Sequence, residues 1–81
     1  MKSAKNKKKD KEIILTNIFK KVFKINKINK INFTYEKTIN WDSLKHMLLV
    51  SMVEKKFQTK IDEIEISRLT SFIKFLNLIN K

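Results

Sequence analysis

Residues 43–58, SLKHMLLVSMVEKKFQ, form a long segment rich in apolar residues in this 81-residue chain. At about 100° per residue, its apolar side chains fall on two opposite faces of a helix. The face that we expect to pack in the core carries His46, Leu49, Val50, Val53 and Phe57. The opposite face carries Leu44, Met47 and Leu48, joined by Ser51 and Lys55. A helix with two apolar faces is either fully buried or binds a partner, and so short a chain cannot easily bury it completely. The second face is therefore predicted to be an interaction surface.

Other helices are predicted on both sides of this segment. Residues 11–24 repeat apolar side chains at helical spacing, and Asp10 is the expected N-cap. Residues 62–67 read as a short third helix or a turn. For the last helix we expect Thr70 as the cap. Its predicted core stripe consists of Leu69, Phe72, Ile73, Leu76 and Ile79.

Residues 25–42 are predicted to be a long connection. The tract KINKINKIN has a three-residue period, which drifts around a helix axis, and asparagine is a weak helix former. Because the chain has no glycine or proline, asparagine and aspartate are expected to make the turns. The residues that we expect this connection to place on the core are Ile28, Ile31, Phe33, Ile39 and Trp41.

The predicted fold class follows from this layout. It is an all-α bundle of three main helices plus one short helix, with a long first loop. We expect a flexible lysine-rich tail over residues 1–9 and a single domain over residues 10–81, because KSAKNKKK shows no apolar periodicity. We expect this domain to be a monomer.

Composition excludes several classes of site. The absence of cysteine removes disulfides and thiolate metal ligands, and the absence of glycine removes phosphate-binding glycine loops. One histidine, His46, makes a zinc site very improbable. No apolar run approaches the ~20 residues that cross a bilayer, and no signal-peptide cleavage site follows the first helix. On these missing signals we expect a cytoplasmic protein.

The formal charge of +11 is unevenly distributed. Residues 1–39 hold twelve lysines against three acidic residues, whereas residues 40–81 hold seven basic and five acidic residues. A basic chain favours nucleic acid as a partner, and a small helical nucleic-acid-binding domain is the alternative function. Against it, arginine, the main reader of bases, occurs once, at Arg68. The lysine tail also leaves open a peripheral membrane contact.

The helix order and one short motif resemble the acyl carrier protein family. Asp42-Ser43-Leu44 opens the second helix, VEKKF over residues 53–57 ends it with an acidic-x-x-Phe pattern, and ISRLTSFIKFL stands where the family has its third and fourth helices. The resemblance covers roughly residues 10–80. The form WDSLKHMLL…LTSF looks most like small stand-alone carriers that serve adenylating, acyl-transfer, surface-polysaccharide or secondary-metabolite enzymes.

The resemblance implies a covalent cofactor and a set of partners. Ser43 would receive a 4′-phosphopantetheine arm from a phosphopantetheinyl transferase, with Asp42 helping that enzyme to engage. The arm's thiol would hold an acyl or aminoacyl group as a thioester, delivered by a loading enzyme and passed to acyl-acceptor enzymes. The protein itself would catalyse nothing. The side chains that the resemblance assigns to partner binding are Leu44, Lys45, Met47 and Leu48.

Two other interpretations of Ser43 follow from the residues alone. Serine is a common N-cap, so Ser43 is open to a purely structural role. A serine hydrolase site is the other interpretation, since Ser43 and His46 are spaced i, i+3, but only Asp42 is available to orient the histidine. Unlike most of the family, the chain has Lys45, His46 and Leu48 where acidic residues usually follow the serine. This difference predicts specialised partners.

Overall fold

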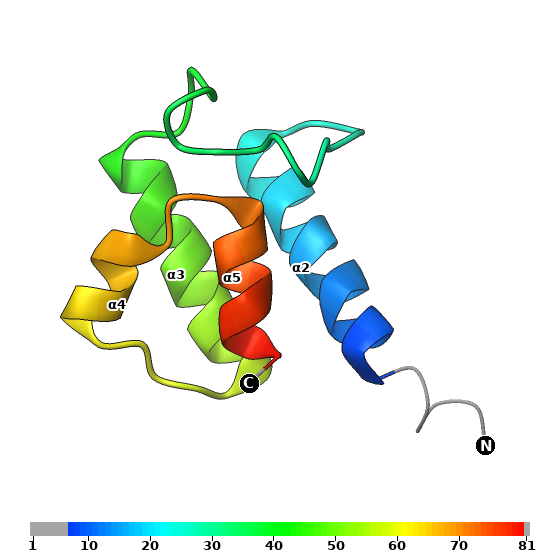
Figure 1. Ribbon diagram of the computed structural model, residues 1–81, viewed down its shortest axis with the longest axis vertical. Helices are drawn as coiled ribbons and strands as arrows, with labels where there is room; N and C mark the ends of the chain where they lie inside the picture. Colours follow the sequence, from blue (N-terminus) through cyan, green and yellow to red (C-terminus); the bar gives the residue numbers. More distant parts are fainter. Residues whose placement is uncertain (1–6, 81) are drawn as a thin grey trace.

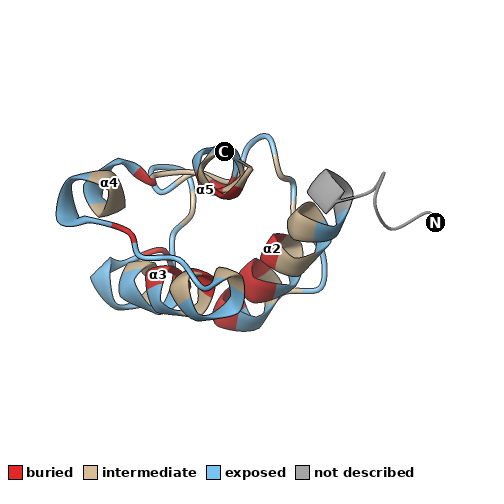
Figure 2. Ribbon diagram, turned by 90° about the horizontal axis from the view of Figure 1, so that it is seen from below, coloured by how far each residue is buried: buried red, intermediate tan, exposed pale blue. Residues whose placement is uncertain are grey.

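The computed structural model describes residues 7–80, with side chains from Asp10 onward, and this part of the chain folds as an all-α bundle (Figure 1). The four helices in the described part are α2 (Lys7–Phe23), α3 (Ser43–Phe57), α4 (Glu63–Arg68) and α5 (Phe72–Ile79). The long helices α2 and α3 lie side by side and run in opposite directions, and α5 packs across them from one side (Figures 1 and 2). The short α4 lies beyond α3, at the edge of the bundle. The predicted fold class is confirmed.

Aromatic side chains form the centre of the core. Phe19 of α2 is fully buried, and its ring meets the rings of Phe72 and Phe75 of α5 at centroid distances of 5.0 and 5.4 Å, edge to face. Trp41, at the end of the long loop, is 3% exposed and stands edge to face against Phe19 at 5.7 Å. Such pairs each contribute about 0.5–1.5 kcal/mol beyond the area that they bury. The aromatic rings therefore join α2, α5 and the loop into one core.

Two predicted helix starts differ from the structure. Helix α2 begins at Lys7, so Asp10 lies inside its first turn and is not its N-cap. The helical backbone thus includes the last three residues of the predicted tail, while residues 1–6 lie outside the described part of the chain. Helix α5 is capped by Ser71, whose Oγ accepts a hydrogen bond from the Lys74 backbone N–H at 3.1 Å, and not by Thr70. The carbonyl of Thr70 instead accepts a hydrogen bond from the loop.

The long loop meets the core at fewer points than predicted. Phe33 and Ile28 are half-buried against the core and Trp41 is buried, but Ile31 and Ile39 are 78% and 98% exposed. The loop is held at the start of α5, where the Tyr35 N–H donates to Thr70 O at 2.8 Å and the Phe72 N–H donates to Phe33 O at 3.0 Å. Between Tyr35 and Trp41 the chain makes tight turns at the protein surface. These turns carry Ile39 into solvent.

The core stripe of α5 is shifted from the predicted one. Phe75 is fully buried, whereas Ile73 is 37% exposed. With the helix beginning at Phe72, positions 72, 75 and 79 share one face. The prediction was wrong about Ile73 and omitted Phe75.

Two helices end on residues that the sequence did not predict. We expected asparagine or aspartate at the turns, but Lys24 and Gln58 take the left-handed conformation, with φ of 56° and 51°.

Within residues 7–80, no helix combines the length and the apolar character that a membrane crossing requires.

Candidate functional site

Ser43 is the first residue of α3, and Asp42 is the N-cap. Asp42 has an extended backbone, and its Oδ1 accepts a hydrogen bond from the Lys45 N–H at 2.9 Å. Its carbonyl oxygen accepts the His46 N–H, also at 2.9 Å, which starts the helical ladder. Because Asp42 already fills the capping position, the interpretation of Ser43 as an N-cap is wrong.

The hydroxyl of Ser43 is accessible and uncommitted. The residue is exposed, and within residues 7–80 its Oγ makes no hydrogen bond to the protein. The first N–H groups of a helix have no partner inside the helix, and they form the positive end of its dipole. An anionic group attached to Ser43 Oγ would therefore lie beside free N–H donors and a favourable partial charge.

A small pocket of about 310 Å³ opens beside Ser43. Met47 and His46 of α3 form one side, Tyr35 of the long loop forms another, and residues from the α4–α5 region complete it. The lining residues are Tyr35, Ser43, His46, Met47, Ser67 and Thr70. The hydrogen bond from the Tyr35 N–H to the carbonyl of Thr70 joins the loop and the segment before α5 within the pocket wall. Sequence reasoning did not select Tyr35, Ser67 or Thr70 for this site, since no local pattern signals contacts between such distant segments.

Side chains that the sequence assigned to partner binding surround Ser43 on the outer face of α3. Leu44, Met47 and Leu48 are 70%, 48% and 44% exposed, as expected for a face directed away from the core. The core-facing residues Leu49, Val50 and Val53 are buried. Lys45 is half-buried and lies on the first turn, where it adds a positive charge next to Ser43.

His46 holds three segments together beside this site. Its Nδ1 lies 3.0 Å from the indole Nε1 of Trp41, and its Nε2 lies 2.8 Å from the carbonyl oxygen of Ile66 in α4. An indole N–H only donates, so Nδ1 is the acceptor, and Nε2 carries the proton and donates to Ile66. With both nitrogens occupied, the ring is not arranged as a base for Ser43. His46 was expected on the core-facing side of this helix, and it is half-buried.

The described residues 7–80 contain no cluster of three or more histidine, cysteine, aspartate or glutamate side chains that could hold a metal ion. No family model matches the chain, and comparisons with curated proteins and with solved structures give no significant match.

Proposed function

We propose that this protein is a carrier that holds an acyl or aminoacyl group on a 4′-phosphopantetheine arm attached to Ser43. The observation that carries the proposal is that the cap of α3 and the free hydroxyl at its first position belong to two different residues. Asp42 satisfies the capping position, and this leaves the exposed Ser43 hydroxyl free at the positive end of the helix. A serine needed only for stability would occupy the cap itself.

The residues present around Ser43 fit this cofactor. The phosphodiester would lie next to the unpaired N–H groups of the first turn, and the neighbouring pocket, with Tyr35 and Met47 in its wall, offers apolar surface to the rest of the arm. When bound, the arm supplies a thiol that holds the acyl group as a thioester. The chain has no cysteine to supply such a thiol itself.

Leu44, Met47 and Leu48 would form the surface that partner enzymes contact. Exposed large apolar residues grouped on one helix face are typical of docking surfaces. Lys45 next to Ser43 would repel partners that dock through lysine and arginine patches, and would admit partners with an acidic or apolar face. The carrier is therefore proposed to serve a specialised pathway, such as surface-polysaccharide or secondary-metabolite synthesis, rather than housekeeping fatty-acid synthesis.

Intact mass after co-expression with a broad-specificity phosphopantetheinyl transferase tests the proposal. We expect wild type to gain the mass of one phosphopantetheine group, Ser43→Ala to gain nothing, and Ser67→Ala to gain it normally. Ser67 is the matched control because it is another exposed serine in the wall of the same pocket. An unmodified wild type, or a mass gain that survives Ser43→Ala, would refute the carrier function.

Binding to nucleic acid is the alternative, and its support is the net charge of +11. Its test is the salt dependence of binding to a DNA duplex by the full chain and by the chain lacking residues 1–9. This alternative would be favoured if the binding constant for the duplex depends on salt concentration equally with and without the tail. The folded domain would then supply the phosphate contacts.

A further inference from the structure

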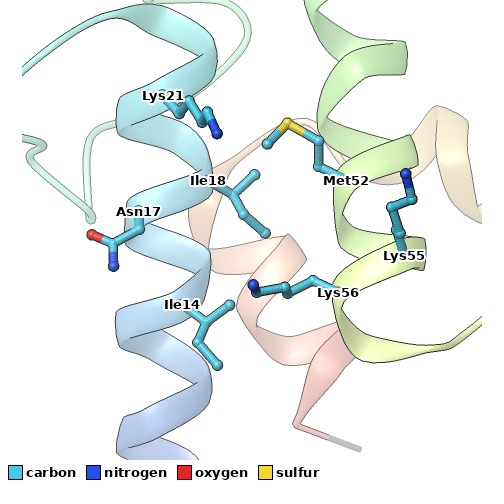
Figure 3. A pocket seen from close by; sticks show the side chains of 7 residues that line it. All are labelled: Ile14, Asn17, Ile18, Lys21, Met52, Lys55 and Lys56. Atoms are coloured by element: carbon cyan, nitrogen blue, oxygen red, sulfur yellow. The ribbon is translucent and has the colours of Figure 1, made fainter.

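A groove runs between α2 and α3 on the side of the bundle away from α5 (Figure 3). Its volume is about 570 Å³. Ile14 and Ile18 of α2 point toward α3, and Met52 of α3 points back toward them, so these three side chains form an apolar floor. Leu48, 44% exposed, lies one turn before Met52 and extends the apolar line along α3.

Three lysines surround this floor. Lys21 of α2 reaches toward α3 near one end of the groove, Lys56 of α3 reaches toward α2 near the other, and Lys55 lies along the α3 side. Within residues 7–80, none of the three forms an ion pair; the salt bridge found there joins Lys30 to Glu12. The nearby carboxylate of Glu54 accepts the Ile61 N–H at 2.8 Å. The groove therefore presents apolar surface together with three positive charges.

The shape of the groove favours a helix as its occupant. It is an open trough between two antiparallel helices, whereas small-molecule sites enclose most of the ligand surface. From Ile14 to Lys21 the groove spans two helical turns, or about 10 Å, which suits the short apolar stripe of an amphipathic helix. A second copy of this chain would bring a further +11 to the same surface, so like-charge repulsion disfavours it.

We propose that the α2–α3 groove docks an amphipathic helix of a partner protein, with apolar residues on Ile14, Ile18 and Met52 and acidic residues beside the three lysines. This surface lies along the length of α3, apart from the pocket beside Ser43. The proposal therefore does not require Ser43 to be modified. The proposed partner has a charge complementary to that of the three groove lysines.

The test is a titration of the full chain with a synthetic helical peptide that carries leucine at every third or fourth position and glutamate on both flanks. Binding is followed by fluorescence anisotropy of the labelled peptide, and amide chemical shifts locate it. We expect shift changes at Ile14, Ile18 and Met52. The triple variant Lys21→Glu, Lys55→Glu, Lys56→Glu should bind about tenfold more weakly, because three exposed ion pairs are each replaced by repulsion.

The matched control reverses the same number of charges elsewhere, at Lys27, Lys37 and Lys74, which are exposed and do not line the groove. Equal weakening in both triple variants, or no weakening in the groove variant, would overturn the proposal. Circular dichroism establishes that each variant is folded, and a single Lys56→Glu variant repeats the test with less perturbation.

Three further measurements address other occupants. They are binding to mixed phosphatidylcholine and phosphatidylserine vesicles, binding to a DNA duplex, and sedimentation of the chain alone. If reversal of the groove lysines abolishes binding to vesicles or DNA, or abolishes self-association, while the peptide stays bound, the acidic helix is the wrong occupant. If it weakens the peptide alone, the proposal stands, whatever the outcome for Ser43.

Discussion

The indole Nε1–H of Trp41 donates a hydrogen bond to Nδ1 of His46 across 3.0 Å, and Nε2 of the same ring lies 2.8 Å from Ile66 O. This chain of contacts fastens the end of the long loop and α4 to the first turn of α3. The pocket beside Ser43 is assembled from these same segments. His46 is thus a positioning residue for the proposed site.

Replacing His46 with phenylalanine is expected to lower the free energy of unfolding by about 1–3 kcal/mol, because the buried Trp41 N–H loses its acceptor. In a Trp41→Phe background the same change should cost less, since no indole donor remains. Urea unfolding followed by circular dichroism measures both. Costs that simply add in the double variant would contradict coupling through this hydrogen bond.

Removing the cap at Asp42 separates its structural role from its role in modification. Asp42→Ala should destabilise the protein by about 0.5–2 kcal/mol, whereas Asp42→Asn, which keeps an acceptor oxygen, should change stability little. Thermal unfolding measures this difference. Under the carrier proposal, Asp42→Asn should nevertheless slow the transferase, because the charge is lost. Equal destabilisation by alanine and asparagine would show that the charge of Asp42, and not its capping hydrogen bond, stabilises the helix.

Two neighbouring residues of α5 should respond very differently to truncation. Phe75→Ala should cost about 3–5 kcal/mol, because it leaves a cavity beside Phe19 and Trp41. Ile73→Ala, on the more exposed flank, should cost clearly less, about 1 kcal/mol, because the side chain is 37% exposed. Chemical unfolding of the two variants shows whether the core face of α5 contains Phe75, as in the structure, or Ile73, as the sequence predicted. A larger cost for Ile73→Ala would reverse the assignment.

Leu44 tests the proposed docking surface next to Ser43. Leu44→Asp should leave stability within about 0.5 kcal/mol of wild type, because the side chain is 70% exposed. It should slow transferase modification about tenfold if Leu44 is a central contact. Ile31→Asp, at a 78% exposed loop position, is the control and should be modified at the wild-type rate. Unchanged modification of Leu44→Asp would remove Leu44 from the interface.

The positions of the helices could be predicted from the sequence because periodicity and capping act over a few residues. The apolar pattern over 43–58 placed α3 within one residue of its observed end, and it placed Ser43 correctly at the first position of the helix. The outward face with Leu44, Met47 and Leu48 also followed from helical geometry alone. These predictions do not depend on which residues pack against the helix from across the core.

The loop was harder to predict, because its isoleucines have no periodic neighbours to indicate a direction. Ile28 and Ile39 are each followed by an asparagine, yet Ile39 is exposed and Ile28 packs on the core. The difference arises from the pairing of Tyr35 with Thr70 and of Phe72 with Phe33, both of which join segments about 35–39 residues apart. The same pairing carries Tyr35 into the pocket wall beside Ser43.

By itself, the sequence determined that this chain forms an all-α bundle, that a helix starts after Asp42, and that Ser43 stands exposed at its head. Local hydrogen bonding and side-chain periodicity are sufficient for those statements. The tertiary structure alone decided that His46 hydrogen-bonds to both Trp41 and Ile66, that a pocket opens beside Ser43, and that Lys21 and Lys56 lie near opposite ends of an apolar groove. Each of these depends on packing between elements distant in the chain, which no local pattern encodes.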